Sequence, residues 1–159
     1  MNKPDSLRAA LTTVMPELAR DPDRLRIWVD KGRIRCPMTT SRDFSYEYTL
    51  SLLLVDFTGH PALVFLTIND WLRINQPDLA QVSRDSGYAF ETEVIDAETI
   101  DLLIDLELTE RAELVPRAGG GWLIEHPAEP DPLFADELAL SDPPAPLTQV
   151  WLGDVQIVP

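Results

Sequence analysis

Two segments of the chain place their apolar residues at the spacing of an amphipathic helix. The first covers residues 5–15, and Pro16 disfavours its continuation. The second begins near Pro61, which suits the first turn of a helix, and ends at Gln76-Pro77. Such stripes indicate that one side of each helix is buried. The stripes consist of Leu7, Ala10, Leu11, Val14 and Met15 in the first helix and of Val64, Phe65, Ile68, Trp71 and Leu72 in the second.

Other segments alternate apolar and polar residues, which is the pattern of a strand with one buried face. The predicted strands cover residues 25–29, 44–54, 88–95 and 100–108. The last is the most regular, because its apolar residues occupy every second position from Ile100 to Leu108. Strict alternation predicts an antiparallel strand. Residues 114–124 predict a further hairpin with the glycines 119–121 at its turn.

The order of these elements predicts the α+β class, with a largely antiparallel or mixed sheet and two helices on one face. A chain of 159 residues fits one domain, which we expect to cover residues 1–126. Residues 127–159 hold seven prolines and scattered apolar residues, so they predict an extended C-terminal arm rather than an independent domain. Four apolar residues near or within the arm either pack back on the sheet or anchor a subunit interface: Trp122, Phe134, Trp151 and Leu152.

The charge balance disfavours two classes of partner. Thirteen Lys and Arg against 27 Asp and Glu give a net charge of −14, whereas a nucleic-acid-binding protein needs a basic surface. The same charge disfavours anionic membranes. The apolar runs are also far shorter than a membrane span, which takes about 20 residues. We therefore expect neither sequence-specific nucleic acid nor a membrane as a partner.

Acidic residues are concentrated in the last two predicted strands, where they alternate with the apolar positions. This spacing points the carboxylates away from the core, so we interpret them as a solvated sheet face. The functional alternative is an acidic surface that faces another subunit or a lumen. The residues of this candidate face are Glu91, Glu93, Asp101, Asp105 and Glu107.

Residues that commonly carry catalysis are few. Cys36 is the single cysteine, and His60 and His126 are 66 positions apart. We interpret both histidines as residues at element boundaries and Cys36 as a small half-buried residue. The three glycines lack the Lys-Ser/Thr that follows in a phosphate-binding loop. The sequence therefore predicts no catalytic residue, cofactor or metal, and a protein that is not an enzyme.

Several segments together carry a resemblance to a known family. They are Lys-Pro-Asp-Ser-Leu-Arg-Ala-Ala-Leu at 3–11, Pro-Glu-Leu-Ala-Arg-Asp-Pro-Asp-Arg-Leu at 16–25, Phe-Ser-Tyr-Glu-Tyr-Thr-Leu at 44–50, Val-Asp-Phe at 55–57, Trp-Leu-Arg-Ile-Asn-Gln-Pro at 71–77 and Asp-Leu-Leu-Ile-Asp-Leu-Glu-Leu-Thr-Glu-Arg at 101–111. In this order they resemble the tail completion protein R family of temperate phages with contractile tails. The resemblance covers about residues 3–111, and the arm matches less clearly.

The resemblance implies a structural subunit of a phage or of a phage-tail-like bacteriocin. Such subunits form a ring, typically six-fold, on the head-proximal end of the tail tube and stop its growth. The implied partners are further copies of the chain, the tail tube protein, the tail sheath protein and, where a head exists, the head–tail connector protein. The implied location is the host cytoplasm during assembly and then the particle. The family contributes no catalytic or metal-binding residue.

Three other functions stay open at this point. The chain could be a connector adaptor that attaches on the portal side, or a small hydrolase with Cys36 or His60 in its site. It could also be an acidic inhibitor that imitates DNA, because carboxylates on alternate strand residues are spaced by about 6.8 Å. For a ring, we hypothesise that acidic side chains line the lumen and keep transiting DNA from adhering.

Overall fold

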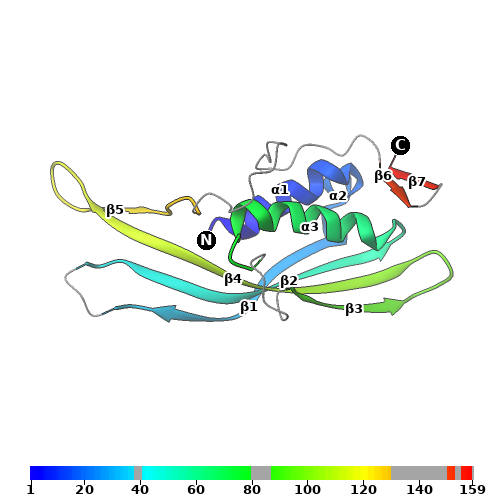
Figure 1. Ribbon diagram of the computed structural model, residues 1–159, viewed down its shortest axis with the longest axis horizontal. Helices are drawn as coiled ribbons and strands as arrows, with labels where there is room; N and C mark the ends of the chain where they lie inside the picture. Colours follow the sequence, from blue (N-terminus) through cyan, green and yellow to red (C-terminus); the bar gives the residue numbers. More distant parts are fainter. Residues whose placement is uncertain (38–40, 80–86, 130–149, 153–154, 159) are drawn as a thin grey trace.

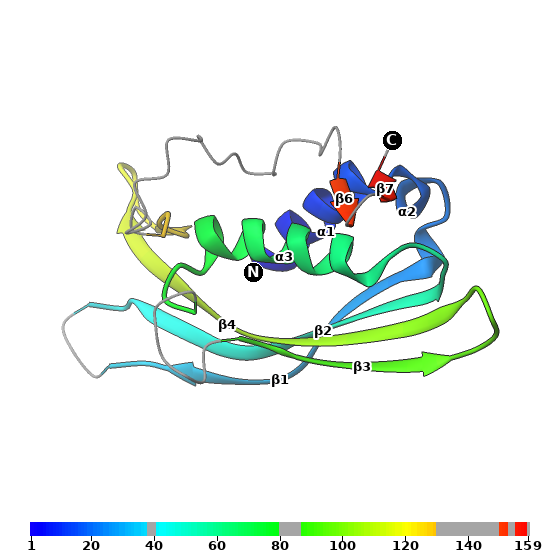
Figure 2. The same cartoon turned by 45° about the vertical axis from the view of Figure 1, so that its right-hand side comes forward.

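The computed structural model describes residues 1–37, 41–79, 87–129, 150–152 and 155–158. Its main feature is a five-stranded antiparallel sheet with helices packed on one face (Figure 1). The predicted α+β class is confirmed. No helix of the described segments covers the opposite face, which is called the open face below (Figure 2).

The elements follow one another as the hydrophobic pattern predicted, with some additions. The helices are α1 (Lys3–Val14), α2 (Pro16–Arg20), the short 3-10 helix η1 (Pro22–Arg24) and α3 (Pro61–Asn75). The strands are β1 (Leu25–Arg35), β2 (Phe44–Phe57), β3 (Ala89–Val94), β4 (Ile100–Pro116), β5 (Trp122–Glu125), β6 (Val150–Leu152) and β7 (Val155–Val158). The sheet order is β1-β2-β4-β3, β5 pairs with the far end of β4, and β6 and β7 form a separate pair.

The core lies between the helices and the two central strands. Cross-strand pairs of β2 and β4 stack apolar side chains on this face, as in Leu52 opposite Ile104 and Leu54 opposite Leu102. Each of these four side chains is fully buried. Burying a side chain of this size contributes about 1.5–3 kcal/mol, so the strict alternation of β4 fixes which face receives the helices.

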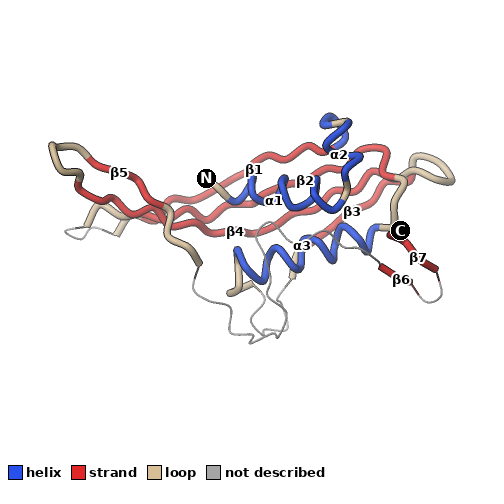
Figure 3. Tube along the Cα trace, turned by 90° about the horizontal axis from the view of Figure 1, so that it is seen from above, coloured by secondary structure: helices blue, strands red, loops and turns tan. Residues whose placement is uncertain are grey.

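The two long helices contact each other on the same side of the sheet, with α1 over the strands in the view from above (Figure 3). Trp71 of α3 is fully buried, and its Nε1 donates a hydrogen bond of 3.0 Å to the Ser6 hydroxyl of α1. Pro61 stands in the first turn of α3, where a missing N–H costs nothing. His60 precedes it and caps the helix, because its Nδ1 accepts from the Ala62 amide at 3.1 Å.

β1, β2 and β4 are longer than the sequence pattern predicted, whereas β3 is one residue shorter at each end. β1 continues to Arg35 and β4 to Pro116, where the side chains are no longer buried and the alternation therefore weakens. The short helix α2 and the pair β6–β7 were not predicted. The glycine turn is confirmed: Gly119, Gly120 and Gly121 all have φ near +90 to +99°, which residues with a Cβ rarely adopt.

None of the helices in the described residues is long and apolar enough to cross a membrane.

Candidate functional site

The open face carries the acidic residues that the sequence singled out. The strand register places all five on this face, with Glu93 opposite Asp101 and Ala89 opposite Asp105. Two of the carboxylates are held by hydroxyls of β2, because Thr49 donates to Glu107 at 2.7 Å and Ser51 donates to Asp105 at 2.6 Å. Asp101 accepts from the Asp56 amide at 2.9 Å. Glu91 and Glu93 are exposed on the edge strand β3.

The opposite edge of the open face is basic, which the sequence analysis missed. The register pairs Arg26, Lys31, Arg33 and Arg35 with residues of β2 whose side chains point to the open face. Arg26 and Lys31 are five positions apart, so in a regular strand Arg26 would lie on the opposite face from Lys31, Arg33 and Arg35. A β-bulge between Val29 and Lys31 inserts one residue and returns the last three to the face of Arg26. Arg35 also pairs with Glu47 of β2.

An apolar hairpin projects beyond the helices at one end of the sheet (Figure 1). It consists of the end of β4 and of β5, and it exposes Val115, Trp122, Leu123 and Ile124. The Trp122 side chain is 48% exposed, and the Arg42 guanidinium lies 4.8 Å from its ring centroid. Trp122 therefore does not pack into the core of its own chain.

The other three predicted anchors lie in the C-terminal segment. Trp151 and Leu152 belong to β6, whose backbone pairs with β7. Phe134 lies outside the described residues. The structure does not bring Trp151 or Leu152 into the sheet that holds Trp122.

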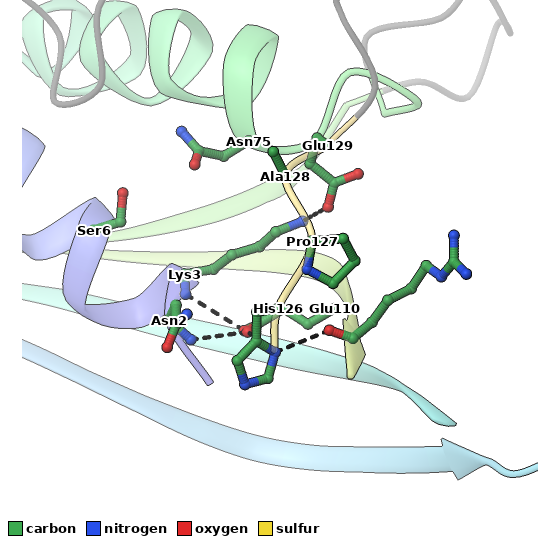
Figure 4. A pocket seen from close by; sticks show the side chains of 10 residues that line it. Asn2, Lys3, Ser6, Asn75, Glu110, His126, Pro127, Ala128 and Glu129 are labelled. Atoms are coloured by element: carbon green, nitrogen blue, oxygen red, sulfur yellow. Dashed lines mark hydrogen bonds and ion pairs between the residues drawn. The ribbon is translucent and has the colours of Figure 1, made fainter. Parts of the chain in front are cut away.

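A buried polar cluster lies where the N-terminus of α1 meets β4 (Figure 4). Its centre is Glu110, which is 4% exposed. The Glu110 carboxylate accepts from the backbone N–H of Asn2 at 2.8 Å, from the backbone N–H of Lys3 at 3.4 Å and from the Tyr48 hydroxyl. Negative charge at this position also suits the positive end of the helix dipole of α1. Burial and the neighbouring Glu110 carboxylate raise the pKa of Tyr48, so its hydroxyl stays a donor.

Side chains replace a strand along part of β4. β3 pairs with β4 up to Asp105, and β5 pairs with it from Glu113 onwards. Between these two segments, the side-chain oxygen Oε1 of Gln76 accepts from the backbone N–H of Thr109 at 3.0 Å. The Lys3 ammonium donates to the backbone carbonyl of Thr109 at 2.6 Å. Unpaired backbone groups here would cost stability, so these side chains complete the sheet.

The same cluster attaches the segment that follows β5. Lys3 forms an ion pair of 2.6 Å with Glu129, and His126 Nδ1 lies 2.9 Å from the Arg111 carbonyl oxygen and 4.0 Å from Glu110. The pocket at this point is about 160 Å³. Pockets for small-molecule ligands are larger, at roughly 300–1,000 Å³. Its charged groups form hydrogen bonds and ion pairs with one another, so the cluster holds α1, β4 and the segment after β5 together.

Cys36, His60 and His126, the candidate catalytic residues, lie at three different elements. Cys36 follows β1 and is exposed, so the prediction of a half-buried cysteine was wrong. His60 caps α3, and His126 belongs to the polar cluster, so both histidines lie at element boundaries as predicted. Within the described residues no three His, Cys, Asp or Glu side chains are grouped so that they could hold a metal ion.

The described surface thus offers a charged sheet face, two strand edges and an apolar hairpin, which are features suited to contact other proteins. The profile of the family described as P2 phage tail completion protein R (GpR) matches residues 1–130. Tail completion protein R of Escherichia phage P2 is 39% identical to this chain over 134 residues, which cover 83% of this chain and 86% of that protein. No solved structure matches the chain significantly.

The chain belongs to the phage tail completion protein R family. The resemblance inferred from the sequence segments is therefore confirmed, and with it a structural role in the completion of a phage tail. The match ends at residue 130, so it includes the whole sheet and the polar cluster and excludes β6 and β7.

Proposed function

We propose that this protein caps the head-proximal end of a tail tube, ends tube growth and prepares the tail for sheath and head joining. The observation that carries the proposal is the family match over residues 1–130. The structure supports it because the exposed features are a sheet face, two strand edges and an apolar hairpin, all suited to binding proteins. The proposed role is structural and involves no catalysis.

We further propose that the subunits form a closed ring, six-fold as is typical of such terminators. Each subunit of a ring needs two different complementary surfaces, because the interface is heterologous. The projecting β4–β5 hairpin is suited to bind the tail tube or the sheath, since exposed aromatic side chains are strong interface anchors. A connector protein is the partner on the other side where a head exists. Assembly takes place in the host cytoplasm, and the ring then stays in the particle.

The central acidic residues are proposed to line the lumen of the ring. Asp105 and Glu107 lie on β4 in the interior of the open face, with their carboxylates held by Ser51 and Thr49. Negative charge at the lumen repels the phosphates of transiting DNA. A ring structure in which this face points outward would contradict the proposal.

The test of the main proposal is electron microscopy of tails from a strain that lacks this gene, beside the parent strain and a complemented strain. We expect tubes of uncontrolled length or tails without a finished end, and normal tails after complementation. Tails of normal length that mature and join heads without the gene would refute the proposal. Cross-linking to the tube protein rather than to the portal would separate a terminator from a connector adaptor.

A further inference from the structure

Both edge strands of the main sheet expose most of their length. In β1 every residue from Trp28 to Arg35 is exposed, and in β3 every residue is exposed. Among the described residues, no strand pairs with the outer side of either edge. A free edge of this length offers backbone donors and acceptors to a strand of another chain.

The two edges carry opposite charge. β1 holds four basic residues and one acidic residue, which leaves a formal charge of +3 in a chain whose total is −14. β3 holds two glutamates and no basic residue, so its formal charge is −2. Like charges on both edges would keep copies of the chain apart. Opposite charges instead attract the β1 edge of one copy to the β3 edge of another and disfavour pairing of two identical edges.

The helix side of the same two strands is apolar and exposed. On β1 the register places Val29 and Ile34 on this side, opposite Leu50 and Tyr46 of β2, and Ile34 is 67% exposed. On β3 the residues on this side include Phe90 and Val94, which are 55% and 72% exposed. Each edge strand therefore has charged side chains on the open face and apolar side chains on the helix side. When the two strands pair, charged residues meet charged residues and apolar residues meet apolar residues.

We propose that β1 of one subunit pairs with β3 of the next copy of this chain, so that the sheets of the ring are continuous. Pairing brings Lys31 and Arg33 beside Glu91 and Glu93 on the open face. It also brings the exposed apolar residues of the two strands together on the helix side. The inference rests on the proposed ring and specifies which surfaces close it.

Strand direction agrees with such a junction. Every neighbouring pair in the order β1-β2-β4-β3 is antiparallel, so β1 and β3 of one chain run in opposite directions. Rotation about a ring axis keeps the direction of a strand along that axis. The β3 strand of one subunit and the β1 strand of the next are therefore antiparallel as well. Because the two edges differ, the contact is heterologous, which is the kind of contact that a closed ring requires and a two-fold dimer does not use.

Disulfide cross-linking, carried out on isolated tails and on the soluble fraction of the host lysate, tests the junction. Cys36→Ser provides the background, and Lys31→Cys or Arg33→Cys is combined with Glu91→Cys or Glu93→Cys, which gives four pairs. Within one chain three strand spacings of about 4.8 Å separate these edges, which is too far for a disulfide. We expect at least one pair to form, on oxidation, a ladder of covalent oligomers that ends at the ring number. Each single-cysteine variant is the control and forms dimers at most.

The possible outcomes separate this inference from the proposed function. Completed tails without a ladder in any of the four pairs would overturn the edge junction and leave the terminator role intact. A ladder in the cytoplasm, with the chain never present on tails, would support the junction and refute the terminator role. A ladder on completed tails supports both.

Charge reversal gives a second measurement that does not depend on cysteine geometry. We expect Lys31→Glu with Arg33→Glu, and separately Glu91→Lys with Glu93→Lys, to lower the yield of completed tails at least tenfold. The four changes together restore the yield, because the attraction is re-established with reversed sign. Arg20→Glu with Ala9→Glu and Ala19→Glu makes the same change in net charge as Lys31→Glu with Arg33→Glu, at exposed helix sites away from the edges and the hairpin, and leaves the yield unchanged. Normal yield from both reversed pairs would overturn the junction.

Discussion

The two halves of β4 have different environments. In the first half Leu102, Ile104, Leu106 and Leu108 lie under the helices and are at most 1% exposed. From Val115 onward, and across the turn to Ile124 of β5, the apolar side chains lie in solvent. Hydrophobic burial explains the first half, because it holds the sheet against α1 and α3. It does not explain the second half, where exposed apolar residues serve a protein partner better than the isolated fold.

The comparison therefore separates residues that stabilise the fold from residues available for assembly. Substitutions should therefore differ in their effect on folding stability, with the largest loss at the core residue Trp71 and the smallest at Trp122 of the hairpin.

Trp71→Ala should have the largest effect on stability. The side chain is fully buried between the layers, and truncation removes its contacts and its hydrogen bond to Ser6. We expect the free energy of unfolding to fall by about 3–5 kcal/mol, measured by urea denaturation with circular dichroism. A loss below about 1 kcal/mol would show that the helices contribute less to the core than their burial indicates.

Glu110→Gln should weaken the attachment of α1 to β4. The Glu110 carboxylate accepts with both oxygens from the backbone N–H groups of Asn2 and Lys3 and from the Tyr48 hydroxyl. The glutamine side chain has one acceptor oxygen, so it cannot keep all three bonds. Hydrogen bonds to a charged group contribute about 1.5–3 kcal/mol, so we expect a loss of roughly that size.

Glu113→Gln is the matched control for Glu110→Gln. Glu113 lies three residues further along β4, in an exposed ion pair of 3.3 Å with Arg111. Removing such a pair costs at most about 1 kcal/mol. Equal losses for the two variants would show that the buried cluster gives no special stability.

Tyr88 should make the fold sensitive to alkaline pH. Burial against α3 raises the pKa of Tyr88 to about 12, and its hydroxyl donates to Asn69 at 3.1 Å. The folded pKa lies above the usual value near 10, so the folded state holds the proton more tightly between these values. Its contribution to stability is therefore present below pH 10 and is lost as the pH rises toward 12.

The check compares the wild type with Tyr88→Phe by urea denaturation at pH 8 and pH 11. The variant should lose less stability between the two pH values, because it has no phenol to ionise. An identical loss in both proteins would contradict the prediction. Tyr48 has a raised pKa in both proteins, so part of the alkaline loss should persist.

Trp122→Ala should leave folding almost unchanged and impair assembly. The ring is half exposed, and its contact with the Arg42 guanidinium is worth about 0.5–1 kcal/mol at an exposed site. We expect a stability change no larger than that and a clear fall in the yield of completed tails in a complementation assay. A large loss of stability together with normal tails would show that this hairpin stabilises the fold and is not used in assembly.

Much of the fold followed from local pattern. The stripes of α1 and α3 and the alternation of β2 and β4 gave the correct elements and the correct buried face, because periodicity determines which side chains share a face. The placement of Glu91, Asp105 and Glu107 away from the core followed from the same rule. The family resemblance was also carried by the sequence alone.

Local pattern could not reveal the arrangements that depend on partners distant in the chain. The bulge in β1 gathers Arg26, Lys31 and Arg33 on one face, and only the register against β2 shows it. The Glu110 cluster joins residues more than 100 positions apart, so nothing near Glu110 in the sequence marks it.

The amino-acid sequence thus determined the layers, the buried faces and the family, because these depend on spacing along one segment. The tertiary structure alone decided that β1 and β3 form opposite edges of the sheet, one basic and one acidic. It also decided that the hairpin bearing Trp122 projects beyond the helices. The physical reason is that strand order and register are set by backbone hydrogen bonds between distant segments, which leave no periodic trace in either segment.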